Sequence, residues 1–229
     1  MNRNPVLNSP DDITDELIQQ IINNDLNSLT INYEFTRKFD KFYKGPNWEN
    51  WNKERALINP FWKANKISAL KRIEFEIKLG KNVHSLACAF ENFEKLEYVN
   101  IKDTSGITDM HQMFSDAKSF NQPIGNWDTS NVTDMFGMFW MAESFNQPIG
   151  NWNTSNVTDM SFMFYHANSF NQPIGNWNTS NVINMCRMFY LAKKFNQPIN
   201  NWDISNVGWK QGMFKRAFSY KHPKPKKFK

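Results

Sequence analysis

Four consecutive blocks of the sequence repeat one 25-residue pattern. They span residues 110–134, 135–159, 160–184 and 185–209, and they share the pattern M-x-x-M-F-x-x-A-x-x-F-N-Q-P-I-(G/N)-N-W-(D/N)-(T/I)-S-N-V-x-x. A fixed period of this length indicates one structural unit per block, too small to bury its own apolar face and stacked on near-copies of itself. The repeat therefore predicts a solenoid, whose long surface favours binding over catalysis in an enclosed pocket.

Apolar residues within each block are spaced like one face of a helix. In the second block they are Met135, Met138, Phe139 and Ala142, at offsets 0, 3, 4 and 7 from the first methionine. A short strand is expected around residues 124–127, directly after Pro123, because proline cannot donate to an inter-strand ladder. Each turn is therefore predicted to hold one short helix and one short strand, with the strands of successive turns stacked in a parallel sheet.

The segments that flank the four blocks define three predicted regions. Degenerate copies of the pattern extend the solenoid over residues 67–220. Residues 1–66 are expected to form an N-terminal α+β capping module with a helix to about residue 24, a strand over 29–35 and a segment rich in tryptophan: Trp48, Trp51 and Trp62. Residues 221–229 combine prolines with like charges and are expected to be a disordered basic tail.

Charge and cysteine content limit the possible partners and covalent links. Residues 110–209 carry four basic and six acidic side chains, a net charge of about −2, whereas residues 210–229 carry seven lysines, one arginine and no acid, a net charge of +8. The net charge of +5 therefore reflects the tail. Cys88 and Cys186 align four units apart, on the order of 20 Å at the spacing of stacked strands, which predicts two free thiols.

The sequence contains neither a signal peptide nor an apolar stretch long enough to span a bilayer. No membrane span is therefore expected, and the sequence alone predicts a cytoplasmic location.

The repeat is similar to a known family at the motif M-F-x-x-A-x-x-F-N-Q-P-I-G-N-W-(D/N)-T-S-N-V-T-D-M. This motif resembles the BspA-type leucine-rich repeat, in the 25-residue variant of Mycoplasma-type lipoproteins and other bacterial surface proteins. The resemblance is strong over residues 110–220 and weaker over about 70–109. It implies an α/β fold, a leucine-rich-repeat-like right-handed solenoid, and a role in protein recognition or adhesion. Relatives of this kind are often displayed on the cell surface.

Residues that stay the same in every block are expected to form the core, and residues that vary are expected to face a partner or water. The repeated methionines, Phe139 and its equivalents, and the tryptophans at 127, 152, 177 and 202 are thus predicted to be interior. Large residues occur instead at or near two variable positions, which lie five and six residues after the first methionine of each block. We predict a partner-binding surface formed by Trp140, Tyr165, Tyr190, Phe136, Phe162 and Leu191.

Catalysis has little support in the sequence. The four histidines, His84, His111, His166 and His222, have no partner at metal-ligand or triad spacing, and no paired carboxylates or phosphate-binding loop are evident. The sequence therefore predicts a non-enzyme without metal or cofactor, which binds a protein partner of unknown identity. Two alternatives remain: adhesion to a host protein or glycan, and binding of nucleic acid or an anionic surface through the basic tail, of which nucleic acid is the less favoured partner.

Overall fold

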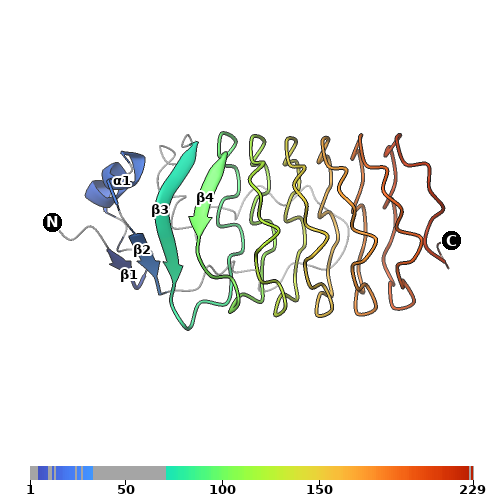
Figure 1. Cartoon of the computed structure of the whole chain (residues 1–229), viewed down its shortest axis with the longest axis horizontal. Coiled ribbons are helices and arrows are strands. Elements are labelled where there is room, and N and C mark those ends of the chain that lie inside the picture. Colours follow the sequence, from blue (N-terminus) through green and yellow to red (C-terminus); the bar gives the residue numbers. More distant parts are fainter. Residues whose placement is uncertain are drawn as a thin grey trace.

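The computed structural model describes residues 5–9, 12, 14–23, 25–26, 28–32, 71–226 and 228. Its regular elements all lie in the N-terminal half. They are β1 (Val6–Leu7), α1 (Asp15–Ile22), β2 (Ser28–Ile31), β3 (Arg72–Leu79) and β4 (Tyr98–Ile101). The four strands form one parallel sheet in the order β1-β2-β3-β4. The protein is thus mixed, with a parallel sheet and one helix among the described residues (Figure 1).

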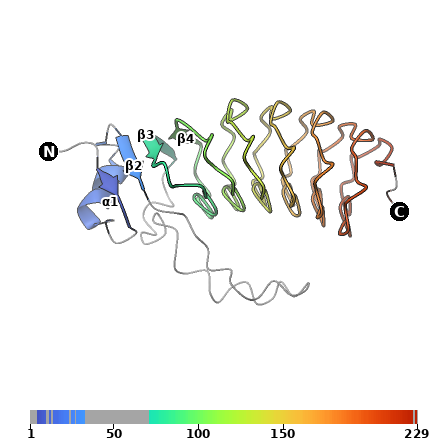
Figure 2. The same cartoon turned by 90° about the horizontal axis from the view of Figure 1, so that it is seen from below.

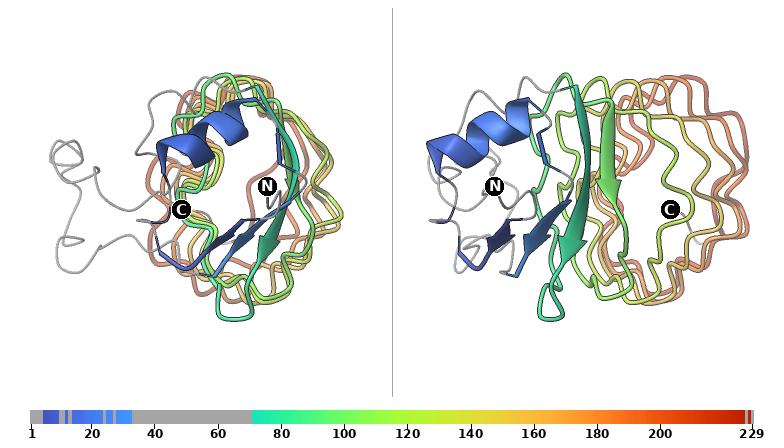
Figure 3. Two further views of the ribbon diagram at one scale, coloured as in Figure 1. Left: turned by 90° about the vertical axis from the view of Figure 1, so that its left-hand side faces the viewer. Right: turned by 60° about the vertical axis from the view of Figure 1, so that its left-hand side comes forward.

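Local sequence explains where α1 begins and which face it buries. The Thr14 hydroxyl caps the helix by accepting a hydrogen bond from the Leu17 N–H (3.2 Å), and Asp15 and Glu16 stand in the first turn, where the helix dipole favours acids. Leu17, Ile18 and Ile21 form the buried face. Seen along the long axis, α1 lies at the N-terminal end of the molecule (Figure 3). The tryptophans at 48, 51 and 62 lie outside the described residues.

Beyond β4 the chain runs through successive turns that lie side by side along the long axis (Figures 1 and 2). We call each turn a coil. Equivalent positions of neighbouring coils meet in parallel bridges: Ser85 with Asp109, Asp109 with Asp134, Asp134 with Asp159, Asp159 with Asn184, and Asn184 with Trp209. One repeat of the sequence therefore forms one coil, and the coils stack in sequence order.

The prediction of one helix per repeat is wrong. Residues 135–142 form consecutive turns, in which the N–H groups of Met138 and Ala142 bond carbonyls three residues back. The N–H groups at offsets 0, 2, 4 and 6 bond the next coil instead, as Phe139 does with the Met163 carbonyl (3.0 Å). Offsets 2 and 6 have left-handed backbones, such as Gly137 and Met141, each with φ 57°. Both features break a right-handed helical path, while the apolar residues stay interior.

The predicted strand around residues 124–127 is also wrong. This segment is a tight turn closed by a hydrogen bond from the Trp127 N–H to the Ile124 carbonyl (3.1 Å), which suits its Gly-Asn centre. Side chains connect the coils at the preceding residues. The Asn121 Oδ1 accepts from the Asn146 N–H (2.9 Å), and the same bond recurs from Asn171 to Asn146, from Asn196 to Asn171 and from Lys221 to Asn196. The repeated asparagines thus satisfy backbone N–H groups of the neighbouring coil.

The core consists of ladders of identical side chains. Phe114, Phe139, Phe164 and Phe189 are buried and stack on one another with centroids 5.7–5.9 Å apart. The repeated methionines are completely buried, and the repeated tryptophans are at most 9% exposed. Each tryptophan from Trp152 onward donates its Nε1–H to an isoleucine carbonyl of the preceding coil, at 3.0–3.1 Å. The prediction that the repeated methionines, phenylalanines and tryptophans are interior is confirmed, whereas the equally constant Asn121, Pro123 and Asn131 are exposed.

Several described residues of the predicted disordered tail contact the last coil or one another. The Phe228 ring lies 5.4 Å from Phe214, the Lys224 ammonium lies 4.9 Å from the Phe228 ring centre, and Pro225 is buried. The Tyr220 hydroxyl donates to the Pro223 carbonyl (3.0 Å). These contacts cover part of the end of the core.

Deletion of residues 221–229 is expected to lower the free energy of unfolding by about 1–3 kcal/mol, because one aromatic side chain leaves its packing and the Phe214 face meets water. Chemical denaturation followed by tryptophan fluorescence measures this. The exposed Lys226 provides the control, since Lys226→Ala should leave stability unchanged. A truncated protein as stable as the full chain would show that the tail does not close the stack.

Candidate functional site

Five aromatic rings from three successive coils meet on one side of the stack. We call Phe136, Trp140, Phe162, Tyr165 and Tyr190 the aromatic cluster. Along the stack, the Trp140 ring lies 5.5 Å from Tyr165, and Tyr165 lies 4.9 Å from Tyr190 with nearly parallel planes (4°). Because neighbouring coils stack directly on one another, rings at the same offset lie at stacking distance.

Phe136 and Phe162 join the other three rings into one surface. The Phe162 ring lies 5.1 Å from Trp140, 5.7 Å from Tyr165 and 5.7 Å from Phe136. Phe162 occupies the left-handed position of its coil (φ 58°), where the second coil has Gly137. The side chains that the sequence pattern grouped together are therefore brought together by the structure. Whether they bind a partner stays a prediction.

The aromatic cluster is less exposed than the sequence suggested. Phe136 is buried (8% exposed), and the other four rings are half-buried. Leu191, the sixth predicted residue, is also half-buried and has a left-handed backbone (φ 58°), with its N–H bonded to the Lys215 carbonyl (3.1 Å). The faces that remain accessible are those of rings already fixed by their neighbours.

Arg187 belongs to this surface, although the sequence pattern did not indicate it. Its guanidinium carbon lies 5.7 Å from the Phe162 ring centre and 6.0 Å from that of Tyr190, within the range of cation–π attraction. Among the described residues it has no ion-pair partner. Its position in the repeat could have indicated this. Arg187 lies two residues after the first methionine of its block, and Phe162 has the same place one coil earlier.

Two titratable groups of this region have raised pKa values. Burial raises the pKa of the Tyr165 hydroxyl, an effect that the nearby Tyr190 reinforces and that Arg187 and Arg216 only partly oppose. Burial likewise raises the pKa of the Cys186 thiol despite the adjacent Arg187. Both groups are therefore protonated near neutral pH, and a protonated thiol is a poor nucleophile.

A second cluster is formed by Asp109, His111 and Asp134. Asp134 stands two residues before Phe136 of the aromatic cluster. The sequence indicated no partner for the histidines, but the His111 Nδ1 lies 2.9 Å from the Asp109 Oδ1. The missed signal was the aspartate directly before the first methionine of each unit, which recurs as Asp109, Asp134 and Asp159.

The coils that carry both clusters match a protein family. The family model described as "Mycoplasma protein of unknown function, DUF285" matches residues 81–177 and 147–228. The chain belongs to this family. The DUF285 matches include the whole aromatic cluster and the Asp109–His111–Asp134 group, and they begin after β3. No curated protein and no solved structure matches the chain.

Within the part of the chain that the structure describes, no helix has the length and apolar character needed to cross a bilayer. The helix α1 spans only eight residues.

Proposed function

We propose that this DUF285 protein is a non-catalytic repeat scaffold that binds a protein partner through the aromatic cluster and Arg187. The observation that carries the proposal is the mutual contact of five rings from three coils, beside a guanidinium with no ion-pair partner among the described residues. We further propose that the stacked coils are a right-handed solenoid of the BspA-type leucine-rich-repeat class.

The aromatic cluster has the properties of a binding hot spot. Binding energy at interfaces concentrates in tryptophan, tyrosine and arginine, and individual truncations cost about 2 kcal/mol or more. Rings that are stacked before binding lose little rotamer freedom when a partner covers them. Trp140, Tyr165 and Tyr190 are held in this way by their neighbours in the stack.

The charge of the surface indicates the character of the partner. Arg187 carries a planar, permanently charged group that pairs with carboxylates in a bidentate manner. Lys215 and Arg216 follow at offsets five and six of the next coil, and both are exposed. A partner segment with an apolar side chain beside an aspartate or glutamate would complement both the rings and the guanidinium.

Replacing Trp140, Tyr165 and Tyr190 together by alanine is expected to abolish partner capture, because the contact faces of the hot spot are lost. The purified chain, immobilised and exposed to extract of the native host, captures the partner, which is identified by mass spectrometry and then measured directly by titration. Arg187→Glu should weaken the same interaction at least ten-fold and leave the core untouched. This single variant keeps the test decisive if the triple variant is unstable.

The matched control uses two exposed aromatic residues outside the cluster. Trp209 is 57% exposed and Phe218 is 72% exposed, more than any ring of the cluster. The double variant Trp209→Ala/Phe218→Ala should bind as the wild type does. Unchanged capture by the triple variant and by Arg187→Glu would contradict the proposal, and capture lost only on deletion of residues 221–229 would assign binding to the basic tail.

A further inference from the structure

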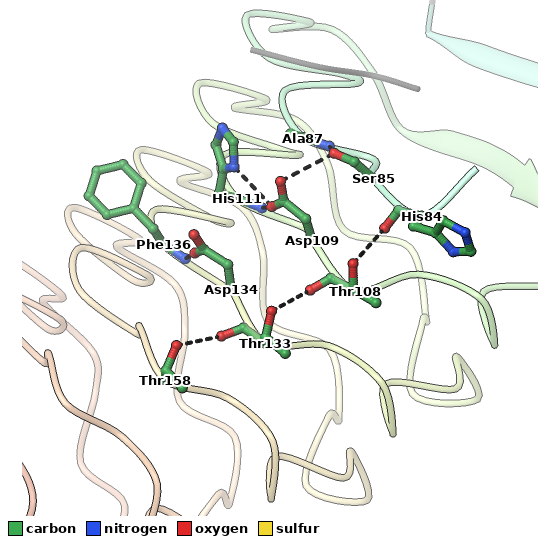
Figure 4. A network of polar contacts seen from close by, with 10 residues as sticks. All are labelled: His84, Ser85, Ala87, Thr108, Asp109, His111, Thr133, Asp134, Phe136 and Thr158. Carbon is green, nitrogen blue, oxygen red and sulfur yellow. Dashed lines mark hydrogen bonds and ion pairs between the residues drawn. The ribbon is translucent and has the colours of Figure 1, made fainter. Parts of the chain in front are cut away.

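A column of acidic side chains runs along the stack, and Figure 4 shows two of them, Asp109 and Asp134, near Phe136. Asp109, Asp134 and Asp159 occupy equivalent positions of three coils and pair with one another through parallel bridges. Each uses one carboxylate oxygen to accept the backbone N–H two residues ahead: that of His111 (2.9 Å), Phe136 (2.7 Å) and Ser161 (2.7 Å). The stack thus fixes three carboxylates in register, one coil apart.

The second carboxylate oxygens differ in their partners. The Asp109 Oδ2 accepts from the Ser85 hydroxyl (3.2 Å), and the Asp159 Oδ2 accepts from the Asn184 side-chain amide (3.1 Å). The Asp134 Oδ2 accepts no hydrogen bond from any residue that the structure describes. Asp134 therefore has an oxygen available for a ligand, in the middle of the column.

His111 adds a nitrogen donor to these carboxylates. Its side chain is 12% exposed, and its Nδ1 lies 2.9 Å from the Asp109 Oδ1. One ligand atom from each of Asp109, His111 and Asp134 can be chosen such that all three lie within 4.8 Å of one another. Figure 4 shows the His111 ring beside the Asp109 carboxylate, with Asp134 in the next coil.

The charges of the column favour a bound cation. Asp109, Asp134 and Asp159 follow one another at bridged positions of adjacent coils, and each is only partly exposed. Like charges thus oppose one another within a partly desolvated row, and a dication between two of them would remove that repulsion.

We propose that Asp109, His111 and Asp134 bind one divalent first-row transition-metal ion, such as Zn²⁺. Two carboxylates and a neutral imidazole give a donor set of charge −2, which balances a dication. A nitrogen donor favours zinc and its neighbours over calcium and magnesium, which take oxygen ligands. Two of the ligands belong to the loop 109–111 and the third to the next coil, so the ion would link two coils.

The dimensions of the site suit such an ion after a small side-chain movement. Zinc holds nitrogen and oxygen ligands at about 2.0–2.2 Å in a tetrahedral arrangement, so its ligand atoms lie roughly 3.5 Å from one another. The three groups, within 4.8 Å of one another, must therefore close by about 1.3 Å at most. The backbones at 109 and 134 are already fixed by their bridge, which leaves this adjustment to the side-chain torsions.

The test is titration of the metal-free full chain with ZnCl₂ by isothermal calorimetry, followed by Co²⁺ substitution and visible absorption. The wild type is expected to bind one equivalent at this site and to give the d–d bands of a nitrogen–oxygen site. His111→Ala and Asp134→Asn should each weaken this binding at least ten-fold. Saturating Zn²⁺ should raise the melting temperature of the wild type but not of these two variants.

His166 supplies the matched control. Its Nδ1 lies 3.9 Å from a Glu143 oxygen, so His166→Ala removes a second histidine near an acid without touching the proposed site. This variant should bind Zn²⁺ as the wild type does. Binding that survives both His111→Ala and Asp134→Asn, the absence of saturable binding by the wild type, or a Co²⁺ spectrum dominated by thiolate bands would each overturn the proposal. None of these outcomes bears on partner capture by the aromatic cluster.

Discussion

Gly150→Ala is expected to destabilise the protein by about 3 kcal/mol, at the upper end of the usual cost of overpacking. A Cβ at this position would lie 2.5 Å from the Pro173 carbonyl oxygen of the next coil. The obstructing atom belongs to the backbone, and hydrogen bonds from Gln172 and Trp177 to the preceding coil, before and after Pro173 in the sequence, hold it in place. The methyl group can therefore be accommodated only if two coils move apart, which also weakens the ladders of phenylalanine and tryptophan that cross the gap.

The same close approach recurs at Gly125 and Gly175, where a Cβ would lie 2.4 Å and 2.7 Å from proline carbonyls. The fourth block places Asn200 at this offset. There the corresponding carbonyl, that of Pro223, accepts a hydrogen bond from the Tyr220 hydroxyl, and the chain leaves the repeat pattern. Asn200 thus already carries a side chain where the three glycines cannot.

Asn200→Ala is therefore the control for Gly150→Ala. Asn200 is exposed, so its substitution should change the free energy of unfolding by no more than about 0.5 kcal/mol. Urea denaturation of both variants, followed by tryptophan fluorescence and by far-UV circular dichroism, gives the comparison. Equal stability of the two variants would mean that the coils are spaced more loosely than the structure shows.

The stacking of units and the composition of the core could be predicted from the sequence because both follow from residue identity at a fixed period. Phe139 and Trp152 are buried, as are their equivalents in the other coils, and no other position is open to them once the coils stack. The departure from the repeat at Ile204 has a similar explanation. At this position Thr129, Thr154 and Thr179 each donate a hydroxyl hydrogen bond to a backbone carbonyl of the next coil. Ile204 replaces the threonine in the last block, where the repeats end.

The absence of a helix in each repeat could not be predicted because the apolar spacing at offsets 0, 3, 4 and 7 fits both structures. The difference lies in the two left-handed positions of each coil. Offset two is filled by residues as different as Gln112, Gly137, Phe162 and Arg187, so no glycine signature marks it. The N–H groups bond carbonyls of the next coil, which become available only when the neighbour is already in place.

The aromatic cluster was predictable in membership but not in burial, because stacking between coils covers part of each ring. Arg187 and Asp134 were missed because their contacts with Phe162 and with His111 join different repeats, about 25 residues apart in the sequence. Asp109 and His111 are only two residues apart, but a single acid–histidine pair does not by itself indicate a metal site. Placing each block under the next, in register, would have shown the column of aspartates.

Asp134→Asn is expected to stabilise the metal-free protein above about pH 6, by roughly 2–3 kcal/mol. Burial, with the neighbouring carboxylates, raises the pKa of Asp134 from 3.8 to about 6, and a tenfold change in an acid dissociation constant corresponds to about 1.4 kcal/mol. Because the folded-state pKa lies above the unfolded one, ionisation of Asp134 opposes folding. The penalty is absent below about pH 4, grows as the pH rises to about 6, and is complete above it.

The asparagine should preserve the geometry of the turn, since the chain already uses this arrangement one coil beyond Asp159. There the Asn184 Oδ1 accepts the Cys186 N–H at 3.0 Å, as the Asp134 Oδ1 accepts that of Phe136. Melting temperatures of wild type and variant, measured in EDTA from pH 4 to pH 8, should coincide at the acid end and diverge toward neutrality. A variant that is less stable than the wild type at pH 7.5 would contradict the expected sign.

Asp128→Asn is the control of opposite electrostatic character. The Ser130 hydroxyl and N–H lower the pKa of the exposed Asp128, so its replacement should not stabilise the protein at neutral pH. Asn153 and Asn178 occupy the same position in the next two coils, which shows that the turn accepts either residue. An increase in stability confined to Asp134→Asn would mean that the buried carboxylate at 134 costs folding energy that an asparagine avoids. A cation held between Asp109 and Asp134 offsets that cost in the wild type alone, so added Zn²⁺ should narrow the difference between the two proteins.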